Sequence, residues 1–449
     1  MGKLFGTDGV RGVANLELTP ELAFKLGKAG AFVLSKNKER PVVLIAKDTR
    51  ISGDMLEDAL SAGILSVGGN VIKVGILPTP AVAYLVKEYK ADAGVVISAS
   101  HNPYEYNGIK FFNGEGYKLD DAIEEEIEDI ILNNIDINSH ISGEKLGRGL
   151  ETGEDALIQY ADFLKSTATI DLSDMKLVID CANGAAYKIA EKVFKDLGAE
   201  VITMANQPNG ININDKCGST YPQGLQEKVL AEKADLGLAF DGDADRLIAI
   251  DEKGRLIDGD KIIYICAKML KEQGSLPGDM VTATVMSNIG FHRGIESIGG
   301  KVEITQVGDR YVLESMLKTG CVIGGEQSGH LIFLQYSTTG DGILSALQLI
   351  KAIKFAGKKP SELSDEVTIY PQVLKNAIIK NENKRAYMDD EEIRNEIQRV
   401  EKLMAGEGRV LIRPSGTEPM VRVMIEGKDI DEITKLAEDL AALIMRKLG

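Results

Sequence analysis

Runs of apolar residues alternate with helical patterns through the first three quarters of the chain. The β-branched apolar runs at 42–46, 71–76 and 93–98 predict buried strands. Between the first two runs, residues 55–66 place apolar side chains three and four positions apart, as on one face of a helix. Continuous apolar strands separated by helices are typical of βαβ units, so this pattern predicts a mainly parallel sheet covered by helices.

The same alternation of strands and helices begins again twice. Further strands are predicted at 176–180, 200–203 and 235–240, and then at 280–285, 302–304 and 321–323. We find no sequence identity between the three sets, so any repeat lies in the architecture. This organisation predicts an α/β fold class, with three α/β domains that contain mainly parallel mixed sheets, at residues 1–150, 151–253 and 254–368.

The C-terminal stretch has a different pattern. Residues 384–403 predict a charged amphipathic helix, and residues 429–448 predict a final helix with apolar positions at helical spacing. Short strands are predicted at 409–412 and 421–425, around a loop. A smaller C-terminal α+β domain is therefore predicted at 369–449.

Composition narrows the class of protein. The 449 residues are 44% hydrophobic and 27% charged, and the formal net charge of −16 argues against a nucleic-acid partner. No apolar stretch approaches the roughly 20 residues that span a bilayer, and the N-terminus lacks a signal-peptide pattern, so we expect a cytoplasmic protein without a membrane partner. The acidic run 120–129 is interpreted as the solvated face of a helix, with a partner-binding surface as the alternative.

The cysteines are widely spaced, and none forms a Cys-x-x-Cys pair: Cys181, Cys217, Cys266 and Cys321. Free thiols in a reducing compartment are the simplest interpretation. Only four histidines are present, which argues against a His-rich zinc site.

A serine-containing loop follows the strand predicted at 93–98. Ser100 lies in the run Ser98-Ala99-Ser100-His101-Asn102-Pro103, in which Asn-Pro ends the strand. Ligands of parallel α/β sheets bind at the carboxyl ends of strands, and Ser100 is expected at such an edge. Two interpretations stay open: a turn whose side chains bond their own backbone, and a nucleophile toward which the chain returns Lys110.

Three alternating carboxylates follow the strand predicted at 235–240. They are Asp241, Asp243 and Asp245, with Arg246 directly after them. Their mutual repulsion is unfavourable unless a hard cation binds. An EF-hand is excluded, because Arg246 stands where the turn needs glycine and strands rather than helices flank the loop. A Mg²⁺ site with room for one phosphoryl oxygen is predicted, and a solvated acidic turn is the alternative.

A glycine-rich polar loop, Gly324–His330, follows the third set of strands. Glycines allow a ligand to approach the backbone closely. The side chains of Glu326 and Ser328 offer the acceptors and donors that sugar hydroxyls or an amine require. An ordinary turn is the alternative for this loop.

Two further loops gather basic residues in this acidic chain. The run Arg413–Pro419 combines an arginine fork, two hydroxyls and a glycine amide, and Arg422 follows closely. This set suits a phosphate dianion, and the two prolines stiffen the loop, although an ordinary turn stays open. Near the N-terminus, the run Phe5–Gly12 surrounds Arg11 with glycines and predicts a loop that presents this arginine to an anion.

Taken together, these loops resemble those of the α-D-phosphohexomutase superfamily, in matching order over essentially the whole chain. The loop Gly325–His330 is similar to the version found in bacterial members that act on glucosamine phosphates, whereas members that act on mannose and glucose phosphates typically have Met in place of Gln327. One departure is visible at 46–50, where Ala-Lys stands in place of the usual Gly-Arg.

The resemblance implies four domains around a central cleft and an isomerase activity. The implied reaction interconverts glucosamine 6-phosphate and glucosamine 1-phosphate through a phosphoserine, with Mg²⁺ as cofactor and glucosamine 1,6-bisphosphate as activator and intermediate. This step feeds amino-sugar and peptidoglycan precursor synthesis in bacteria. The implied partner is a small phosphosugar, and a homodimer is left open.

The resemblance also implies roles for individual residues. Ser100 would carry the phosphoryl group and ligate the metal together with the three aspartates. The implied catalytic set is Ser100, Arg11, Lys110, Arg246 and His330, the last as a candidate for proton transfer. The implied substrate-binding set is Glu326 and Ser328 for ring hydroxyls, and Arg413, Ser415, Gly416, Thr417 and Arg422 for the distal phosphate.

Three rival functions remain. The nearest is the same chemistry on another hexose, as in a phosphoglucomutase or phosphomannomutase. A second is a sugar-phosphate-binding regulator without turnover, which would need neither Ser100 nor a complete aspartate set. A third is a Mg²⁺ phosphatase with a phosphoserine intermediate.

Overall fold

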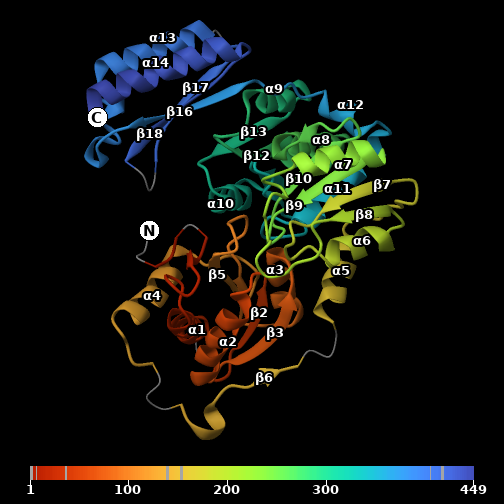
Figure 1. Ribbon diagram of the computed structural model, residues 1–449, viewed down its shortest axis with the longest axis vertical. Helices are drawn as coiled ribbons and strands as arrows, with labels where there is room; N and C mark the ends of the chain where they lie inside the picture. The colour runs from red at the N-terminus through yellow and green to blue at the C-terminus, as the bar shows by residue number, and fades with distance from the viewer. Residues whose placement is uncertain are drawn as a thin grey trace. The chain divides into compact units, whose positions relative to one another are not determined.

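The computed structural model describes residues 4–6, 8–35, 38–137, 141–151, 155–404, 406–415 and 419–449. The chain forms two compact units, whose elements Figure 1 colours in chain order. The first unit contains Met1–Met286 and Gly300–Asp365, and the second contains Ser287–Gly299 and Glu366–Gly449. Among the described residues, no helix has the length and apolar character to cross a membrane.

The first sheet of the first unit is built from the N-terminal third of the chain. Its elements are β1 (Val10–Val13), α1 (Pro20–Ser35), β2 (Val42–Lys47), α2 (Gly53–Ser66), β3 (Asn70–Ile76), α3 (Thr79–Glu88), β4 (Ala93–Ile97), β5 (Tyr106–Asn113), α4 (Asp121–Leu132) and β6 (Gly149–Leu150). The strand order is β1-β5-β4-β2-β3-β6. Strand β2 runs parallel to β3 and β4, whereas β5 runs antiparallel to β4 and β1.

Two further sheets follow in the same unit. The second has the order β11-β10-β9-β7-β8, and the third has the order β13-β12-β14-β15. The elements around the second sheet are α5 (Ala156–Ser166), β7 (Lys176–Asp180), α6 (Ile189–Asp196), β8 (Glu200–Met204), α7 (Gln223–Glu232), β9 (Leu236–Phe240), β10 (Leu247–Asp251) and β11 (Leu256–Ile257). Those around the third are α8 (Gly259–Glu272), β12 (Met280–Thr284), β13 (Lys301–Thr305), α10 (Asp309–Thr319), β14 (Ile323–Gly325), β15 (Leu331–Phe333), α11 (Gly342–Ala356) and α12 (Pro360–Ser364).

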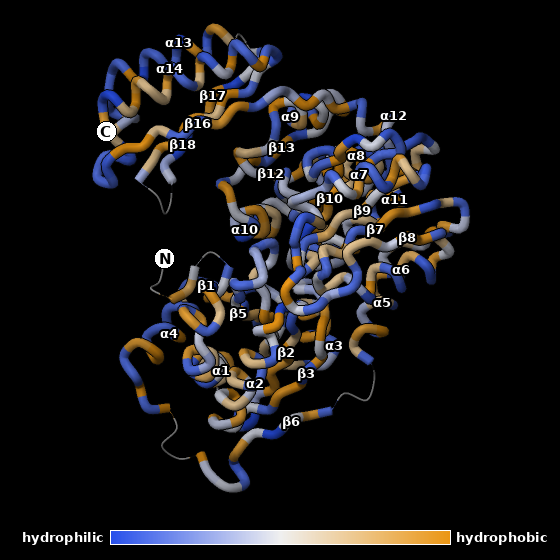
Figure 2. Tube along the Cα trace, in the orientation of Figure 1, coloured by the Kyte–Doolittle hydropathy of each residue, from blue (hydrophilic) through white to orange (hydrophobic). Residues whose placement is uncertain are grey.

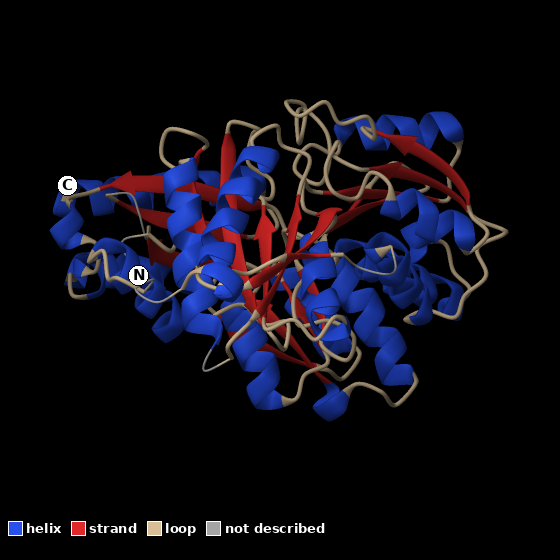
Figure 3. Cartoon of the chain, turned by 90° about the horizontal axis from the view of Figure 1, so that it is seen from below, coloured by secondary structure: helices blue, strands red, loops and turns tan. Residues whose placement is uncertain are grey.

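The three sheets of the first unit share one topology. In each, a first strand pairs in parallel with a second and a third strand, and the third is followed by an antiparallel partner. Figure 3 shows these strands lying between helices. The third strands are β4, β9 and β14, and the serine, aspartate and glycine-rich loops follow them. One architectural position therefore carries all three candidate loops.

The second unit is a smaller α+β arrangement. Its elements are α9 (Ile289–Ser297), β16 (Gln372–Ile378), α13 (Glu391–Met404), β17 (Arg409–Pro414), β18 (Met420–Glu426) and α14 (Ile430–Leu448). The antiparallel sheet has the order β16-β18-β17. The two long helices are amphipathic, with orange apolar residues interleaved among blue polar ones in Figure 2, and their apolar side chains join those of the strands in one core. The predicted multi-domain α/β class is confirmed, while the domain boundaries remain predictions.

Two predicted element bounds are wrong. The helix expected over 384–403 begins only at Glu391, because the carboxylate of Asp390 accepts the N–H of Ile393 at 3.0 Å and caps the helix there. The short 3₁₀ turns Asn381–Asn383 and Ala386–Met388 occupy the preceding segment. The strand predicted at 321–323 is observed at Ile323–Gly325. The first two glycines of the glycine-rich loop therefore belong to the sheet.

The prediction that residues 120–129 form a solvated helix face is wrong for one carboxylate. Glu128 on α4 is 6% exposed, and its Oε1 accepts the backbone N–H groups of Leu4 and Phe5 at 2.7 and 2.6 Å. Buried backbone donors need acceptors, and this carboxylate supplies one for the N-terminal segment. Glu128 therefore fixes the start of the chain on the first sheet.

Candidate active site

Ser100 lies just beyond the end of β4 in a backbone conformation that is rare for serine. Its φ is +52°, in the left-handed region, and the residue is 2% exposed. Its Oγ donates a hydrogen bond to Oδ2 of Asp241 at 2.6 Å, and Nδ1 of His101 lies 3.3 Å from the same oxygen. The hydroxyl thus bonds to a carboxylate from another sheet and not to its own turn, which favours a functional role.

A buried ion pair supports the serine loop from behind. Arg50 and Asp48, whose side chains are both 0% exposed, pair at 2.8 Å. The Arg50 guanidinium also donates to the carbonyl oxygens of Ser100 and Asn102 at 2.9 Å each, and to that of Pro103 at 2.5 Å.

The Asp48 carboxylate also supports the serine loop, through Ser98. Asp48 accepts a hydrogen bond from the Ser98 hydroxyl at 2.6 Å, and Ser98 Oγ accepts the N–H of Ser100 at 3.0 Å. No role was predicted for this pair, although an aspartate and an arginine directly after a buried strand were a usable signal in the sequence. The pair explains how the loop holds Ser100 in its left-handed conformation.

The three aspartates after β9 form one buried cluster. One carboxylate oxygen from each of Asp241, Asp243 and Asp245 lies within 4.8 Å of the others. The Oδ1 atoms of Asp243 and Asp245 are buried without a hydrogen-bond partner. Such orphaned oxygens are costly unless a cation binds them, and carboxylates are the ligands that hard divalent cations prefer. These residues therefore fit a metal ion.

The pKa shifts of the aspartates also support a cation site. Burial, reinforced by the charges of Asp245 and Asp243, raises the pKa of Asp241 well above its usual value. Burial also acts to raise the pKa of Asp245, but His330, Lys110 and Arg246 outweigh it and lower that pKa. A bound cation would relieve the repulsion that Asp241 experiences.

The aspartate loop contacts both other loops of the first unit. The Thr79 hydroxyl, at the start of α3, donates to Oδ2 of Asp243 at 2.6 Å. The N–H of Leu247 donates to the carbonyl of Gly329 at 2.9 Å, beside a bridge between Arg246 and His330. A Cβ on Gly242 would lie 2.5 Å from the Ser100 carbonyl oxygen, so only glycine permits this approach.

A cavity of about 670 Å³ opens at this junction. It brings together six residues that were predicted from the sequence as site residues: Arg11, Ser100, Asp245, Arg246, Glu326 and His330. His101, Asp8 and Asp309, which the sequence analysis did not select, also line it. Burial, followed by the charges of Arg246 and Arg11, lowers the pKa of His101 to about 4, so its imidazole is neutral at neutral pH.

Lys110 lies beside this cavity and not in its lining. Its Nζ is 2.8 Å from Oδ2 of Asp243 and 2.9 Å from Oδ2 of Asp8. Burial acts to lower the pKa of Lys110, but these two carboxylates outweigh it and raise the pKa. Arg11 forms an ion pair with the same Asp8. Lys110 is therefore a charged lysine that neutralises a carboxylate of the aspartate cluster.

The glycine-rich loop directs its side chains in different directions. Glu326 faces the cavity and accepts the N–H of Gly308 at 3.1 Å. Gln327 donates instead to Oδ2 of Asp258 at 3.1 Å, at the cap of α8, and Ser328 is exposed. His330 places Nδ1 3.4 Å from Asp245, and its Nε2 accepts the N–H of Gly340 at 3.1 Å.

The second unit carries the basic loop. Arg413 on β17 and Arg422 on β18 are directly opposite in the antiparallel ladder, so their side chains lie on one face. Burial and the charge of Arg422 lower the pKa of Arg413. Ser415 is 7% exposed, and its carbonyl accepts a bond from Lys384 at 3.0 Å. Gly416 and Thr417 lie outside the described residues.

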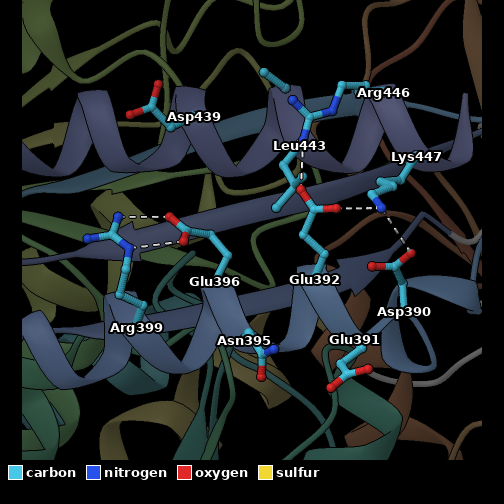
Figure 4. A pocket seen from close by; sticks show the side chains of 11 residues that line it. Asp390, Glu391, Glu392, Asn395, Glu396, Arg399, Asp439, Leu443, Arg446 and Lys447 are labelled. Atoms are coloured by element: carbon cyan, nitrogen blue, oxygen red, sulfur yellow. Dashed lines mark hydrogen bonds and ion pairs between the residues drawn. The ribbon is translucent and has the colours of Figure 1, made fainter.

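A larger hollow of about 990 Å³ lies in the second unit, between α13 and α14 (Figure 4). Two of the glutamates that line it pair with cations: Glu392 with Arg446 and Lys447, and Glu396 with Arg399. Figure 4 shows these pairs spanning the two helices or lying along α13. The hollow holds no nucleophile beside a base, so size alone does not mark the site.

The fold and these loops define a class of enzyme, the phosphohexomutases. The chain belongs to the phosphoglucomutase/phosphomannomutase family. The family's alpha/beta/alpha domains I, II and III match residues 2–137, 158–254 and 258–370, and its C-terminal domain matches residues 374–443. The predicted superfamily is thereby confirmed, as is its mutase, or isomerase, class of activity.

Comparison with individual proteins identifies relatives along the whole chain. The phosphoglucosamine mutase of Thermoanaerobacter pseudethanolicus (strain ATCC 33223 / 39E) is 59% identical over 452 residues, which cover 100% of each chain. A phosphoglucomutase/phosphomannomutase family protein from Burkholderia thailandensis shares the fold, with a TM-score of 0.80 at 24% identity over 98% of this chain and 96% of that one. The Aspergillus fumigatus N-acetylphosphoglucosamine mutase in complex with GlcNAc-6P and magnesium has a TM-score of 0.72 at 18% identity, over 99% and 96%.

Proposed function

We propose that this enzyme interconverts glucosamine 6-phosphate and glucosamine 1-phosphate in the cytoplasm, through a phosphoserine at Ser100 and glucosamine 1,6-bisphosphate. The observation that carries the proposal is the 2.6 Å bond from the Ser100 hydroxyl to Asp241, inside the buried aspartate cluster. The preference for glucosamine rests on the curated relative named phosphoglucosamine mutase, which matches the whole chain.

In this proposal, Mg²⁺ is held by Asp241, Asp243 and Asp245 together with an oxygen on Ser100. The two orphaned oxygens of Asp243 and Asp245 support this ligand set. When bound, the cation supplies positive charge that stabilises negative charge developing on the oxygens of a phosphoryl group. The structural neighbour from Aspergillus fumigatus was solved with magnesium.

The phosphoryl transfer balances within the enzyme and its substrate. The bond between phosphorus and Ser100 Oγ breaks as a bond forms between phosphorus and the free sugar hydroxyl. The proton of that hydroxyl replaces the phosphoryl group on Ser100 Oγ, so the serine leaves the step as a neutral hydroxyl. The bisphosphate then reorients in the site, and its other phosphoryl group is transferred to Ser100. Arg11 and Arg246 line the cavity around Ser100 and stabilise the negative charge of the group in transfer.

The remaining predicted catalytic residues take supporting roles. Lys110 stays charged between Asp243 and Asp8, and so it holds a ligand carboxylate in place. Both ring nitrogens of His330 have partners, namely Asp245 and the N–H of Gly340. We therefore assign His330 to orienting Asp245 and not to proton transfer.

The distal phosphate and the sugar ring are bound by other loops. Two arginines directly opposite in a ladder repel each other, and an anion between them removes that cost. We assign Arg413 and Arg422 to the distal phosphate, with Ser415, Gly416 and Thr417 as further donors. Glu326 and Ser328 are assigned to ring hydroxyls.

A comparison of three substrates tests this proposal. Purified enzyme with Mg²⁺ and a trace of bisphosphate is given glucosamine, glucose or mannose 1-phosphate, and formation of each 6-phosphate is followed. The proposal expects the highest kcat/KM for glucosamine 1-phosphate. A preference for glucose or mannose would move the assignment to another hexose. Release of inorganic phosphate without an isomer would indicate a phosphatase, and binding without turnover would indicate a regulator.

A further inference from the structure

Seven titratable side chains form a closed ring that begins and ends on the aspartate cluster. Its members alternate carboxylates with basic groups in the order Asp243, Lys110, Asp8, Lys118, Asp309, His330 and Asp245. The Lys118 ammonium forms the shortest links, at 2.6 Å to Oδ1 of Asp8 and 2.5 Å to Oδ2 of Asp309. The last contact, 3.7 Å between Asp309 Oδ2 and His330 Nε2, is not a hydrogen bond, because Nε2 accepts the N–H of Gly340.

The ring joins segments that lie far apart in the sequence. Asp8 belongs to the N-terminal loop before β1, and Lys118 lies between β5 and α4. Asp309 is the first residue of α10, after the cap residue Gly308, whose N–H contacts Glu326. Lys118 is the one member of the ring that touches both Asp8 and Asp309, and these two carboxylates both line the cavity at Ser100.

We propose that Lys118 is a positioning residue of the mutase, which holds the N-terminal loop and the start of α10 at the working width of the cavity. Lys118 lines two adjoining cavities of about 330 and 260 Å³ and is not part of the lining at Ser100. It therefore acts through Asp8 and Asp309 and not by touching the reacting atoms. This inference rests on the proposed function for its kinetic consequence, but its structural consequence is independent of any substrate.

The electrostatic reason is the balance of charge in the ring. Four carboxylates of the ring face two lysines and one histidine, with Arg11 as a further cation at Asp8. Removal of Lys118 leaves Asp309 without its closest cation and exposes it to the charge of Asp8 within a largely buried site. Burial acts to lower the pKa of Lys118, but Asp309 and Asp8 outweigh it and raise the pKa. The lysine is therefore charged throughout the working pH range, and its bridge between Asp8 and Asp309 does not depend on its own titration.

The test compares Lys118→Met with Lys118→Arg and with the matched control Lys73→Met. Lys73 also forms an ion pair, at 2.6 Å to Asp58, but its side chain is 40% exposed and remote from the ring. Hydrogen–deuterium exchange is measured on peptides that cover 8–13 and 307–313. Turnover is measured per folded molecule, with the folded fraction taken from near-ultraviolet circular dichroism.

We expect Lys118→Met to raise exchange in both segments and to lower kcat by about tenfold to a hundredfold, the scale of a misplaced reacting group. Lys118→Arg, which keeps the charge, should restore most of kcat, and Lys73→Met should match the wild type. If Lys118→Met does not fold, Lys118→Gln enters the same comparison with the same expected direction.

Two failures are distinguishable. Wild-type exchange in both segments together with unchanged kcat in the Lys118→Met or Lys118→Gln enzyme would overturn the positioning role. Loss of kcat that Lys118→Arg does not restore, without any change in exchange, would also overturn it. A wild-type enzyme that lacks mutase activity would instead overturn the proposed function, and the exchange data would still decide whether the ring holds the two segments.

Discussion

Replacing Arg50 by methionine should destabilise the first unit and also release the serine loop. Arg50 and Asp48 are fully buried, and the guanidinium is a donor to three carbonyl groups of the loop. The substitution leaves the Asp48 carboxylate without its cation and removes the guanidinium donor from all three carbonyls, of which those of Ser100 and Asn102 keep only the Asn214 amide, at 2.9 and 3.2 Å. Removing one partner of a buried ion pair costs about 3–5 kcal/mol of the free energy of unfolding.

This cost translates into a measurable shift of the melting temperature. The first unit holds roughly 350 residues, and unfolding entropy is about 2.1 cal/mol/K per residue, which gives ~0.7 kcal/mol/K. Arg50→Met should therefore lower Tm by ~4–7 °C if the unit unfolds cooperatively. Differential scanning calorimetry is the direct assay, because it measures the midpoint and the enthalpy of unfolding together.

The matched control is Arg40→Met. Arg40 is exposed and donates to the carbonyl of Glu144 at 2.7 Å, so its loss should leave Tm nearly unchanged. Arg50→Met should also lose most of its mutase turnover in the fraction that stays folded, because the Ser100 carbonyl loses a donor. If the Tm of Arg50→Met equals that of Arg40→Met and the variant retains wild-type turnover, the buried pair does not support the serine loop.

Two further predictions concern the buried carboxylates. Asp243→Asn should weaken Mg²⁺ binding about tenfold or more in isothermal titration calorimetry, because a ligand charge is lost, while the exposed control Asp174→Asn should bind like the wild type; equal affinities would remove Asp243 from the metal site. Burial raises the pKa of Asp341 to about 6, above its unfolded value, so its ionisation destabilises the fold as pH rises through that range. Asp341→Asn can keep the bond from the N–H of Leu344 and donate its amide to the Tyr160 hydroxyl, and its stability advantage over the wild type should grow by about 1–3 kcal/mol as pH rises from about 4 to about 6.5; a constant difference in Tm across that range would contradict this.

The local pattern was enough to place the three candidate loops of the first unit. Continuous apolar runs identified β4 and β9, and parallel sheets expose the carboxyl ends of such strands at one edge. Ser100 and Asp241 could therefore be assigned to strand ends without knowledge of their contact. Glycine weakened the signal at β14, because Gly324 and Gly325 pair in the sheet although their composition is typical of a loop.

The supporting contacts had no such local signal. The Glu128 carboxylate accepts the N–H groups of Leu4 and Phe5, which lie more than 120 positions away in the sequence. The acidic residues around Glu128 in the sequence had instead predicted a solvated side chain. The Lys118 bridge from Asp8 to Asp309 likewise depends on three segments that only the folded chain brings together. Pairing between distant charges depends on tertiary geometry, and one sequence contains no periodicity that records it.

The most direct test of the account is the site of phosphorylation. Wild-type enzyme is incubated with glucosamine 1,6-bisphosphate and Mg²⁺, and its intact mass and peptides are compared with those of Ser100→Ala and of the control Ser66→Ala. The account predicts a mass excess of one phosphoryl group that maps to Ser100, is absent in Ser100→Ala and persists in Ser66→Ala. Phosphate at another residue, or full mutase turnover by Ser100→Ala, would contradict it.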